Sequence, residues 1–434
     1  MRTSNFVDVL KSSIPIIIGL QLSNALPVIN LILIRSFGVE VVGGLGLASS
    51  GNLIFAALLT GVGAVLQISV AQSLISEKVN ARLILGTSLF WIFGLSLLVA
   101  VVGLYTLPNL AAFVTGNDEV QLHFIAFLRV WLSIGFVPFS LSQILRYYYL
   151  GKKRNHMVLS IIAISIISNI ALNWLFLHGY GGIAYVGIKG LALGRSISRI
   201  IELCLFLFIL LREEGNRWFL FDYKVMFNQL KYSSTTSLKF ISEAIFVMVV
   251  YVLIDRLQDV SLASHHILMR IWMVIYTLLT GVAISSQSFI GEALKQKRLA
   301  EARRWRLSTF NVIFVFSVLV LVFLNVYRFE IIAWFTIEPE VIQKVTGIII
   351  PLSLSIIFQT YSISSSYYLI ALKQNRTDFL VSLIINWCIF LPIAFLGITY
   401  SKTLEWVWSI VAIFECVRSG IYFIINRKNR PIKV

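Results

Sequence analysis

Charged residues are scarce in this chain of 434 residues: Asp, Glu, Lys and Arg together make up 13%. A soluble globular domain carries about 25% charged and roughly 45–50% apolar residues, whereas hydrophobic residues here reach 58%. This shortage of charge excludes an ordinary soluble domain, because water could not accommodate so much apolar surface. Apolar runs of roughly 20 residues fit the hydrocarbon core of a bilayer as helices, and the sequence contains little else.

Cysteine and histidine are also rare, at three and five residues. Cys204, Cys388 and Cys416 lie inside apolar runs, so we expect small buried side chains rather than disulfides or metal ligands. The sequence has no HExxH, phosphate-binding loop or GxSxG pattern in a suitable context, and the only cluster of potential catalytic or metal-ligating residues in an apolar span is the pair His265-His266. We therefore predict that the chain is not an enzyme and has no cofactor.

The charge that is present is mostly basic, with a formal net charge of +16. In a soluble protein this excess would favour nucleic-acid binding, but here the basic residues lie in short segments between apolar runs. Alternate segments differ: one set has basic clusters such as 152–154 and 303–306, and the other is acidic, as at 118–119. The positive-inside rule places the basic segments and both termini in the cytoplasm. We expect a lipid bilayer around the chain, and no nucleic acid.

About twelve apolar runs are long enough to cross a bilayer. Lipid offers the backbone no hydrogen-bond partners, so each run must form a helix, and the ten-residue alternation of a membrane barrel is absent. The expected fold class is an all-α polytopic membrane protein. The predicted spans are 14–34, 45–73, 84–107, 121–149, 157–177, 184–211, 233–254, 262–291, 308–327, 341–371, 379–398 and 406–425.

The two halves of the sequence repeat each other at a constant offset of 220 residues. The segment 58–62, Leu-Leu-Thr-Gly-Val, recurs at 278–282, and Tyr-Tyr at 147–148 recurs at 367–368. Because each half holds six spans, the repeats share one orientation and are related by an axis along the membrane normal. We predict an N-terminal six-helix lobe over 1–211, a cytoplasmic interfacial linker over 212–231, and a C-terminal six-helix lobe with a basic tail over 232–434.

Ionisable residues inside membrane spans are costly and mark functional sites by default. Glu243 in the seventh span is the clearest candidate, because a carboxylate can bind a proton or a cation. Lys239 lies one helical turn earlier on the same face. Two alternatives stay open for Lys239: pairing with Glu243, or reaching back to the cytoplasmic interface. We predict that Glu243 takes part in cation coupling or substrate binding.

The other charges inside the spans are mostly arginines. Arg129 and Arg270 have no partner nearby in the sequence, so each is a candidate for contacting an anionic group, and Arg270 could instead pair with Glu243. For two further arginines a carboxylate lies three residues away, which favours a structural ion pair. These pairs are Arg199 with Glu202 and Arg418 with Glu415.

Uncharged polar side chains also recur at membrane depth. They are better placed at a cleft between or within lobes than against lipid. His265, near the start of the eighth span, is more typical of a hydrogen-bonding group than of a metal ligand. The residues predicted to face the cleft are Asn30, Asn169, Asn173, Gln287 and Gln359.

Short motifs follow one another in a particular order along the chain. They are Ile14-Pro15, Gly-Gly-Leu-Gly-Leu-Ala-Ser at 43–49, Ala71-Gln72, Gly135 with Pro138, Asn169 with Asn173, Ala263-Ser264-His265, Gly291-Glu292-Ala293 and Arg303-Arg304. Their order resembles that of the MATE family (multidrug and toxic compound extrusion), nearest its bacterial NorM-type branch, over residues 10–426.

This resemblance implies two six-helix lobes in a V shape, alternating access, and antiport of organic compounds against protons or sodium. Three acidic positions usually carry coupling in that branch. Glu243 matches the seventh-span glutamate, whereas the first-span position falls on Asn30 and the tenth-span position on Gln359, or on Ser362 in a shifted register. An amide can coordinate a cation but cannot cycle a proton at physiological pH. Coupling would therefore rest on Glu243 alone.

The expected function is secondary active export of small organic compounds, such as drugs or metabolites, across a bacterial inner membrane. The chain would act as a monomer, with a proton or a sodium ion as the coupling cation. With one acid and spare arginines, the site would suit a neutral, zwitterionic or anionic metabolite better than a cationic drug. The alternative is a lipid-linked glycan flippase of the same superfamily architecture. It would gather arginines in one pocket for a pyrophosphate, namely Arg129, Arg195, Arg199 and Arg270.

Overall fold

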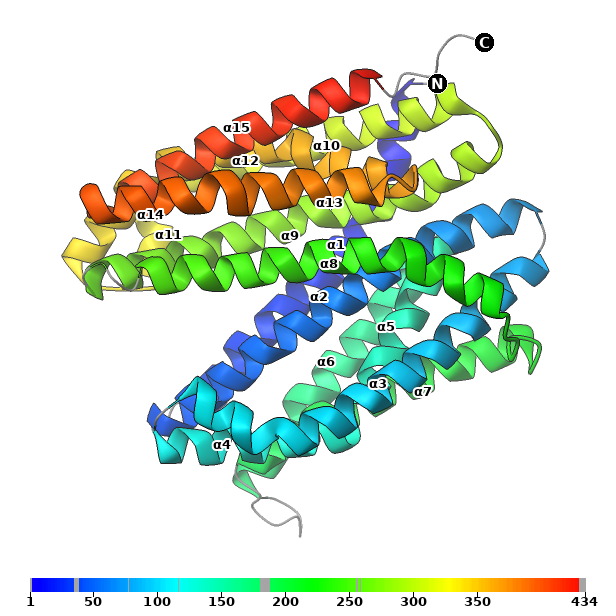
Figure 1. Ribbon diagram of the computed structural model, residues 1–434, viewed down its shortest axis with the longest axis horizontal. Coiled ribbons are helices and arrows are strands. Elements are labelled where there is room, and N and C mark those ends of the chain that lie inside the picture. Colours follow the sequence, from blue (N-terminus) through cyan, green and yellow to red (C-terminus); the bar gives the residue numbers. More distant parts are fainter. Residues whose placement is uncertain are drawn as a thin grey trace. The chain divides into compact units, whose positions relative to one another are not determined.

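The computed structural model of the chain describes residues 2–34, 39–76, 78–115, 117–179, 188–254, 257 and 259–428. These residues form helices joined by short turns, with no strand among them (Figure 1). Eleven helices in this part of the chain are long and apolar enough to cross a membrane. The predicted fold class, an all-α polytopic membrane protein, is confirmed.

The chain divides into two compact units. The N-terminal unit is Ile18–Ser234, and the C-terminal unit combines Met1–Ile17 with Thr235–Val434. In chain order the helices are α1 (Arg2–Ile34), α2 (Val39–Ser76), α3 (Lys78–Val114), α4 (Asp118–Val130), η1 (Trp131–Gly135), α5 (Phe136–Gly151), α6 (Asn155–His178), α7 (Ile188–Glu214), α8 (Tyr223–Ile254), α9 (Asp259–Lys295), α10 (Leu299–Val326), α11 (Arg328–Ala333), α12 (Pro339–Ala371), α13 (Asn375–Leu383), η2 (Ile384–Phe390), α14 (Leu391–Tyr400) and α15 (Leu404–Lys428).

Each predicted span falls on helix, apart from Tyr327 at the end of the ninth, which lies in a bend, and residues 184–187 of the sixth, which lie outside the described residues. Two spans contain a π-helical turn: α4, η1 and α5 form the fourth, and α13, η2 and α14 form the eleventh. The sixth span, α7, is not among the eleven apolar helices. The reason is its charge, because its apolar stretch contains Arg195, Arg199, Glu202 and Arg212.

The predicted repeat extends to backbone detail in one turn of each half. After α5, the N–H of Lys152 donates to the carbonyl of Tyr148 at 3.1 Å, and the corresponding bond after α12 measures 3.0 Å. The next residues, Lys153 and Lys373, have positive φ angles of 59° and 61°. Two such turns at the predicted offset of 220 residues support a common origin for the two halves.

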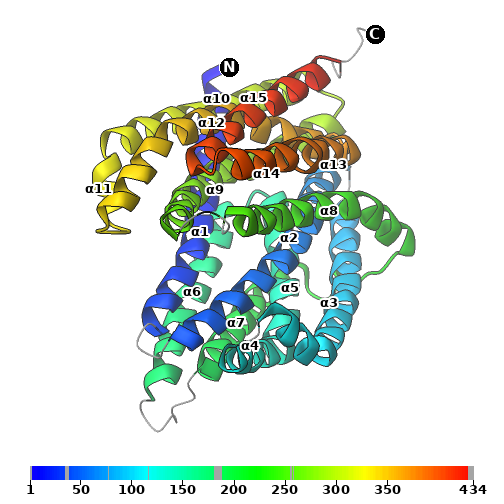
Figure 2. The same cartoon turned by 60° about the vertical axis from the view of Figure 1, so that its left-hand side comes forward.

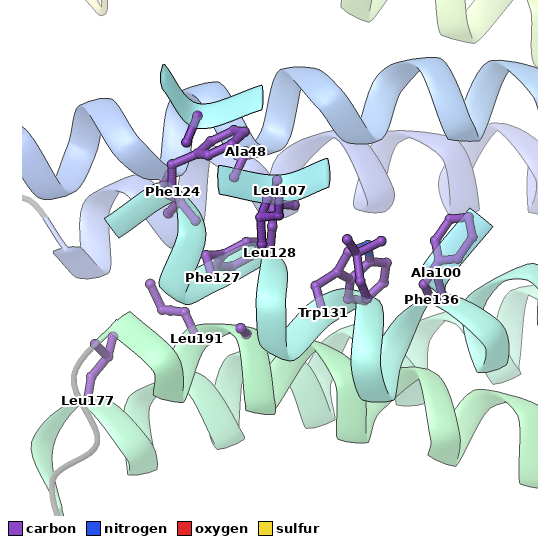
Figure 3. Close-up of a cluster of buried hydrophobic side chains, with 14 residues drawn as sticks. Ala48, Ala100, Leu107, Phe124, Phe127, Leu128, Trp131, Phe136, Leu177 and Leu191 are labelled. Atoms are coloured by element: carbon purple, nitrogen blue, oxygen red, sulfur yellow. The ribbon is translucent and has the colours of Figure 1, made fainter. Parts of the chain in front are cut away.

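The interior of the N-terminal unit is built around Trp131, which is fully buried in η1. Phe124 and Phe127 of α4 and Phe136 of α5 belong to the same cluster, together with small residues such as Ala48 of α2 (Figure 3). Helices in lipid associate through close packing rather than through the hydrophobic effect. Large aromatic and small side chains that fit together therefore hold α2, α3, α4 and α7 in place.

In the C-terminal unit, α12 is the central helix. It packs against α9, α10 and α15, and both views show α12 beside α15 (Figures 1 and 2). Together with α8, α13 and η2, these helices place the polar residues of the candidate site.

The expectation that the three cysteines are buried is wrong. Cys204 in α7, Cys388 in η2 and Cys416 in α15 are all exposed. The reason is the surrounding lipid, which accepts apolar side chains on the outside of a helix as readily as the protein interior does. Large apolar residues such as Phe93 and Leu319 are exposed in the same way.

The segment expected to be a linker packs closely on α3. A Cβ atom added to Gly86 would lie 2.2 Å from the carbonyl oxygen of Trp218 and 2.4 Å from that of Leu220. Backbone atoms cannot yield as a flexible side chain can, so we expect Gly86→Ala to displace the segment and destabilise the protein by about 1–3 kcal/mol. A lower thermal unfolding temperature of the purified protein in detergent would show this.

Gly94 provides the matched control on the same helix. A Cβ atom at Gly94 would meet nothing within 4 Å, and alanine is the better helix former. Gly94→Ala should leave the unfolding temperature unchanged or raise it slightly. An equal loss of stability in both variants would contradict the close packing at Gly86.

Candidate functional site

The C-terminal unit encloses a cavity of about 180 Å³. Side chains of α8, α9, α12, α13, η2 and α15 line it, and most of them are apolar or aromatic. Predicted site residues on its wall are Lys239, Glu243, His265 and Gln359, and the aromatic residues include Phe246, Trp272, Tyr276, Phe390, Trp408 and Phe414. An apolar pocket with a few convergent polar groups is the usual form of a small-molecule site.

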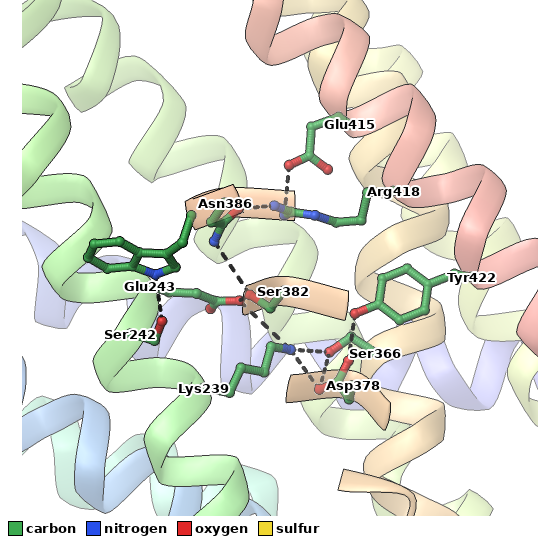
Figure 4. Close-up of polar contacts among 11 residues, drawn as sticks. Lys239, Ser242, Glu243, Ser366, Asp378, Ser382, Asn386, Glu415, Arg418 and Tyr422 are labelled. Carbon is green, nitrogen blue, oxygen red and sulfur yellow. Dashed lines mark hydrogen bonds and ion pairs between the residues drawn. The ribbon is translucent and has the colours of Figure 1, made fainter. Parts of the chain in front are cut away.

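Glu243 of α8 is the carboxylate most available to a ligand in this cavity. Its Oε1 accepts a hydrogen bond from the hydroxyl of Ser382 at 2.7 Å, and its side chain is 25% exposed. The ammonium of Lys239 lies 4.0 Å away, at the limit of an ion pair (Figure 4). Glu243 therefore has acceptor capacity left for a cation.

Lys239 is buried, which excludes the alternative that it reaches the cytoplasmic interface. Its Nζ donates to Asp378 Oδ2 at 2.8 Å and also to the hydroxyl of Ser366. The nearest carboxylate of Lys239 is therefore Asp378 rather than Glu243. The expected pairing with Glu243 is present only as the longer contact.

Asp378 of α13 is the residue that the sequence analysis missed. It is 1% exposed, and besides Lys239 it accepts hydrogen bonds from the hydroxyl of Tyr422 at 2.6 Å and from that of Ser366 at 3.1 Å. These three donors hold the carboxylate of Asp378 in a fixed position. One sequence signal could have found it, because Asp378 corresponds in the 220-residue repeat to the apolar Val158.

A second charged pair lies on α15. Glu415 and Arg418 form the predicted i,i+3 ion pair at 2.8 Å, which confirms that expectation. The guanidinium of Arg418 also donates to the amide oxygen of Asn386 in η2 (Figure 4). Gln359, on the same cavity wall, accepts a hydrogen bond from the indole of Trp272 at 3.2 Å.

The other predicted residues of this unit lie in different surroundings. His265 is 2% exposed, lines the cavity, and packs its ring against Tyr251 and Trp408. Gln287 is fully buried and does not line the cavity. Arg270 is exposed, and within the described residues it forms no ion pair with Glu243, so that suggested contact is not formed.

The predicted residues of the N-terminal unit form a separate polar chain. Asn173 donates to Asn30 at 2.9 Å and to Asn169 at 3.1 Å, and Asn169 donates to Ser198 at 3.3 Å. Asn169 and Asn173 are buried. The bond between Asn173 and Asn169 lies within α6, whereas the bonds to Asn30 and Ser198 connect α6 to α1 and α7.

The arginines of this unit do not form an open cationic pocket. Arg199 is paired with Glu202 as predicted, and Arg146 also binds that carboxylate at 2.9 Å. The guanidinium of Arg195 stacks over Trp131 at 4.4 Å, and Arg129 is exposed. The arrangement that a pyrophosphate site would need is absent from the described part of the N-terminal unit, which counts against the flippase alternative.

The fold and the cavity define a polytopic membrane protein with a cavity among the helices of its C-terminal unit. A sequence profile of the MatE family matches residues 15–175 and 236–404, which is more than half of the chain. The chain belongs to the MatE family. The resemblance to this family, predicted from the order of the motifs, is confirmed, and its NorM-type branch is supported by relatives that carry the NorM name.

Relatives with known names agree with this assignment. The probable multidrug resistance protein NorM of Photorhabdus laumondii is 23% identical over 294 residues, which cover 65% of this chain and 63% of that relative. The probable NorM of Oceanobacillus iheyensis is 24% identical over 405 residues, 89% of this chain and 88% of the relative. Among solved structures, a crystal structure of MATE in complex with MaL6 has a TM-score of 0.90 at 16% identity, and the match covers 98% and 96% of the two chains.

Proposed function

We propose that the chain is a secondary active exporter that exchanges small organic cations for protons or sodium ions across a bacterial inner membrane. It would act as a monomer with both termini in the cytoplasm. The observation that carries the proposal is Glu243, a partly exposed carboxylate on the wall of an aromatic cavity. The family assignment and the multidrug resistance relatives support export rather than uptake.

The charges around the cavity favour a cationic substrate. Counting histidine as neutral, the formally charged lining residues are two bases, Lys239 and Arg418, and two acids, Glu243 and Glu415. Asp378, which contacts Lys239, adds a third acid. The described cavity and this contact thus carry one negative charge in excess, which one bound monovalent cation would neutralise. Because the spare arginines Arg129 and Arg270 do not line this cavity, we propose a cationic substrate in place of the expected neutral, zwitterionic or anionic metabolite.

The aromatic walls point to the same class of substrate. Aromatic faces attract cations by about 0.5–2 kcal/mol each, most strongly where water is excluded. Trp272 and Tyr276 stack on each other with ring centroids 4.8 Å apart, and both line the cavity that contains Glu243. A flat aromatic cation could therefore contact the rings while its charge lies near the carboxylate.

Exchange follows if substrate and coupling ion use the same carboxylate. A site that binds either ligand, but never both at once, couples the movement of one to the countermovement of the other. Glu243 can bind a proton or coordinate a sodium ion, and it can equally pair with an organic cation. Competition for this one group therefore meets one requirement of antiport.

Transport into inside-out membrane vesicles tests the proposal. We expect ethidium, a planar aromatic monocation, to accumulate when the vesicle lumen is made acidic or loaded with sodium, and to leave again when the gradient is collapsed. Vesicles without the protein serve as the control. Accumulation of anionic or neutral compounds, with no movement of ethidium under either gradient, would contradict the proposal.

A further inference from the structure

Lys239 lies between two carboxylates, which differ in the number of hydrogen bonds that they accept from other residues. Its Nζ is 2.8 Å from Asp378 and 4.0 Å from Glu243 (Figure 4). Asp378 also accepts hydrogen bonds from the hydroxyls of Tyr422 and Ser366. If the ammonium moved away, Asp378 would keep two hydroxyl donors in a fixed position.

Glu243 is the less satisfied of the two carboxylates. It accepts a side-chain hydrogen bond from the hydroxyl of Ser382, and its side chain is 25% exposed, against 1% for Asp378. A charge-assisted contact between an ammonium and a carboxylate is about 2.7–2.9 Å long. The ammonium of Lys239 would need to move by only about 1 Å to make such a contact with Glu243, which rotation within its flexible four-carbon stem allows.

We propose that Lys239 is a built-in competitor for the cation site: its ammonium pairs with Glu243 when that carboxylate holds no cation and returns to Asp378 when a cation binds. This inference rests on the proposed role of Glu243. A cation on Glu243 repels the ammonium, and Asp378 with its two hydroxyl donors receives it. When the cation leaves, the ammonium takes its place on Glu243.

The benefit of such a competitor is release of the cargo. An uncompensated carboxylate in a low-dielectric site holds a cation tightly, because its departure leaves a buried charge without a partner. A tethered ammonium supplies the partner as the cargo departs. The apparent affinity of Glu243 for the cargo then falls in proportion to the fraction of protein in which the ammonium occupies that carboxylate. The cargo also dissociates faster.

A fixed ion pair between Lys239 and Asp378 makes a different prediction. In that case the two residues contribute only a constant field, and a change that leaves the charges in place should not alter cation binding. Tyr422→Phe is such a change, because it removes one donor from Asp378 and no charge. In the competitor mechanism, Asp378 then depends more on Lys239 and draws the ammonium away from Glu243.

The test is ethidium binding and release by the purified full-length protein, measured by fluorescence titration and stopped flow. We expect Tyr422→Phe to bind several-fold more tightly, and the neutral pair Lys239→Met with Asp378→Asn to bind about 10-fold more tightly, both with slower release. Asp378→Asn alone should weaken binding by about 10-fold, because Glu243 becomes the only carboxylate in contact with Lys239. The charge-neutral double exchange is compatible with folding, since buried ion pairs can be replaced by uncharged residues of similar volume.

The competitor role would be supported if Asp378→Asn alone weakens ethidium binding while the double variant strengthens it. Slower release of ethidium from Tyr422→Phe would support the same role. Affinity and release rates within twofold of the unmodified protein, for both Tyr422→Phe and the double variant, would overturn it. The variant Glu243→Gln shows whether only the competitor role of Lys239 is wrong or whether the proposed function is wrong as well. If that variant binds ethidium as tightly as the unmodified protein, Glu243 is not the cation site, and both ideas fail.

Discussion

Replacing Glu243 by glutamine is expected to abolish gradient-driven export of ethidium while the protein still folds and inserts. Glutamine keeps the shape of the side chain and can still contact Ser382, but it has no charge to pair with a cation and no proton to exchange at physiological pH. Removing one partner of a buried charge contact costs about 2–5 kcal/mol. This corresponds to a loss of roughly 30-fold or more in affinity.

The measurement is the initial rate of ethidium uptake into inside-out vesicles, with equal amounts of each protein in the membrane. Glu301→Gln is the matched control, because Glu301 lies in the same unit, at the start of α10, and forms an ion pair with the exposed Arg298 away from the cavity. It should transport at the unmodified rate. Unchanged export by Glu243→Gln under a proton or sodium gradient would place coupling elsewhere in the chain.

The helices could be predicted because each carries its own signal. A long apolar run has one stable backbone conformation in lipid, so the composition of a span determines its structure without reference to its neighbours. The exception is instructive: α7 is helical despite Arg195, Arg199 and Glu202. Its charges are matched by residues of other elements, Arg146 of α5 and Trp131 of η1.

The candidate site was only partly predictable, because it depends on contacts between helices and not on the composition of one span. Glu243 was found because it stands alone in an apolar run. Asp378 was missed because it lies in a polar stretch, next to the turn that follows α12, where a charge is expected to meet water. Its burial depends on Lys239, Ser366 and Tyr422, which come from three other helices. The sequence pattern within one segment does not predict contacts among side chains of several helices.

The suggested contact between Arg270 and Glu243 is absent because the side chain of Arg270 points away from Glu243. Both residues lie in adjacent spans, but helix rotation decides which way a side chain points, and a sequence fixes rotation only through packing. Arg270 is exposed, whereas Arg418, assigned to a local pair, lines the cavity. The local pair with Glu415 was correct, yet it did not reveal that both side chains face the cavity.

The second large effect is expected at Glu202 in the N-terminal unit. This carboxylate is fully buried and holds Arg146 and Arg199, and it accepts a hydrogen bond from Ser165 at 3.1 Å. Removing one member of a buried ion pair leaves the others uncompensated, at a cost of about 3–5 kcal/mol. Glu202→Leu should therefore reduce the amount of folded protein recovered in detergent and sharply lower its thermal unfolding temperature.

Removing the charges together should reverse the loss. Because the large cost comes from unpaired charge and not from the missing contact, replacing all three residues by apolar ones of similar volume is expected to be nearly neutral. The triple variant Glu202→Leu with Arg146→Met and Arg199→Met should then unfold within a few degrees of the unmodified protein, far above Glu202→Leu alone. A triple variant as unstable as the single one would show that hydrogen bonds from Ser165 and the packing of the guanidinium groups, rather than charge balance, hold α5, α6 and α7 together.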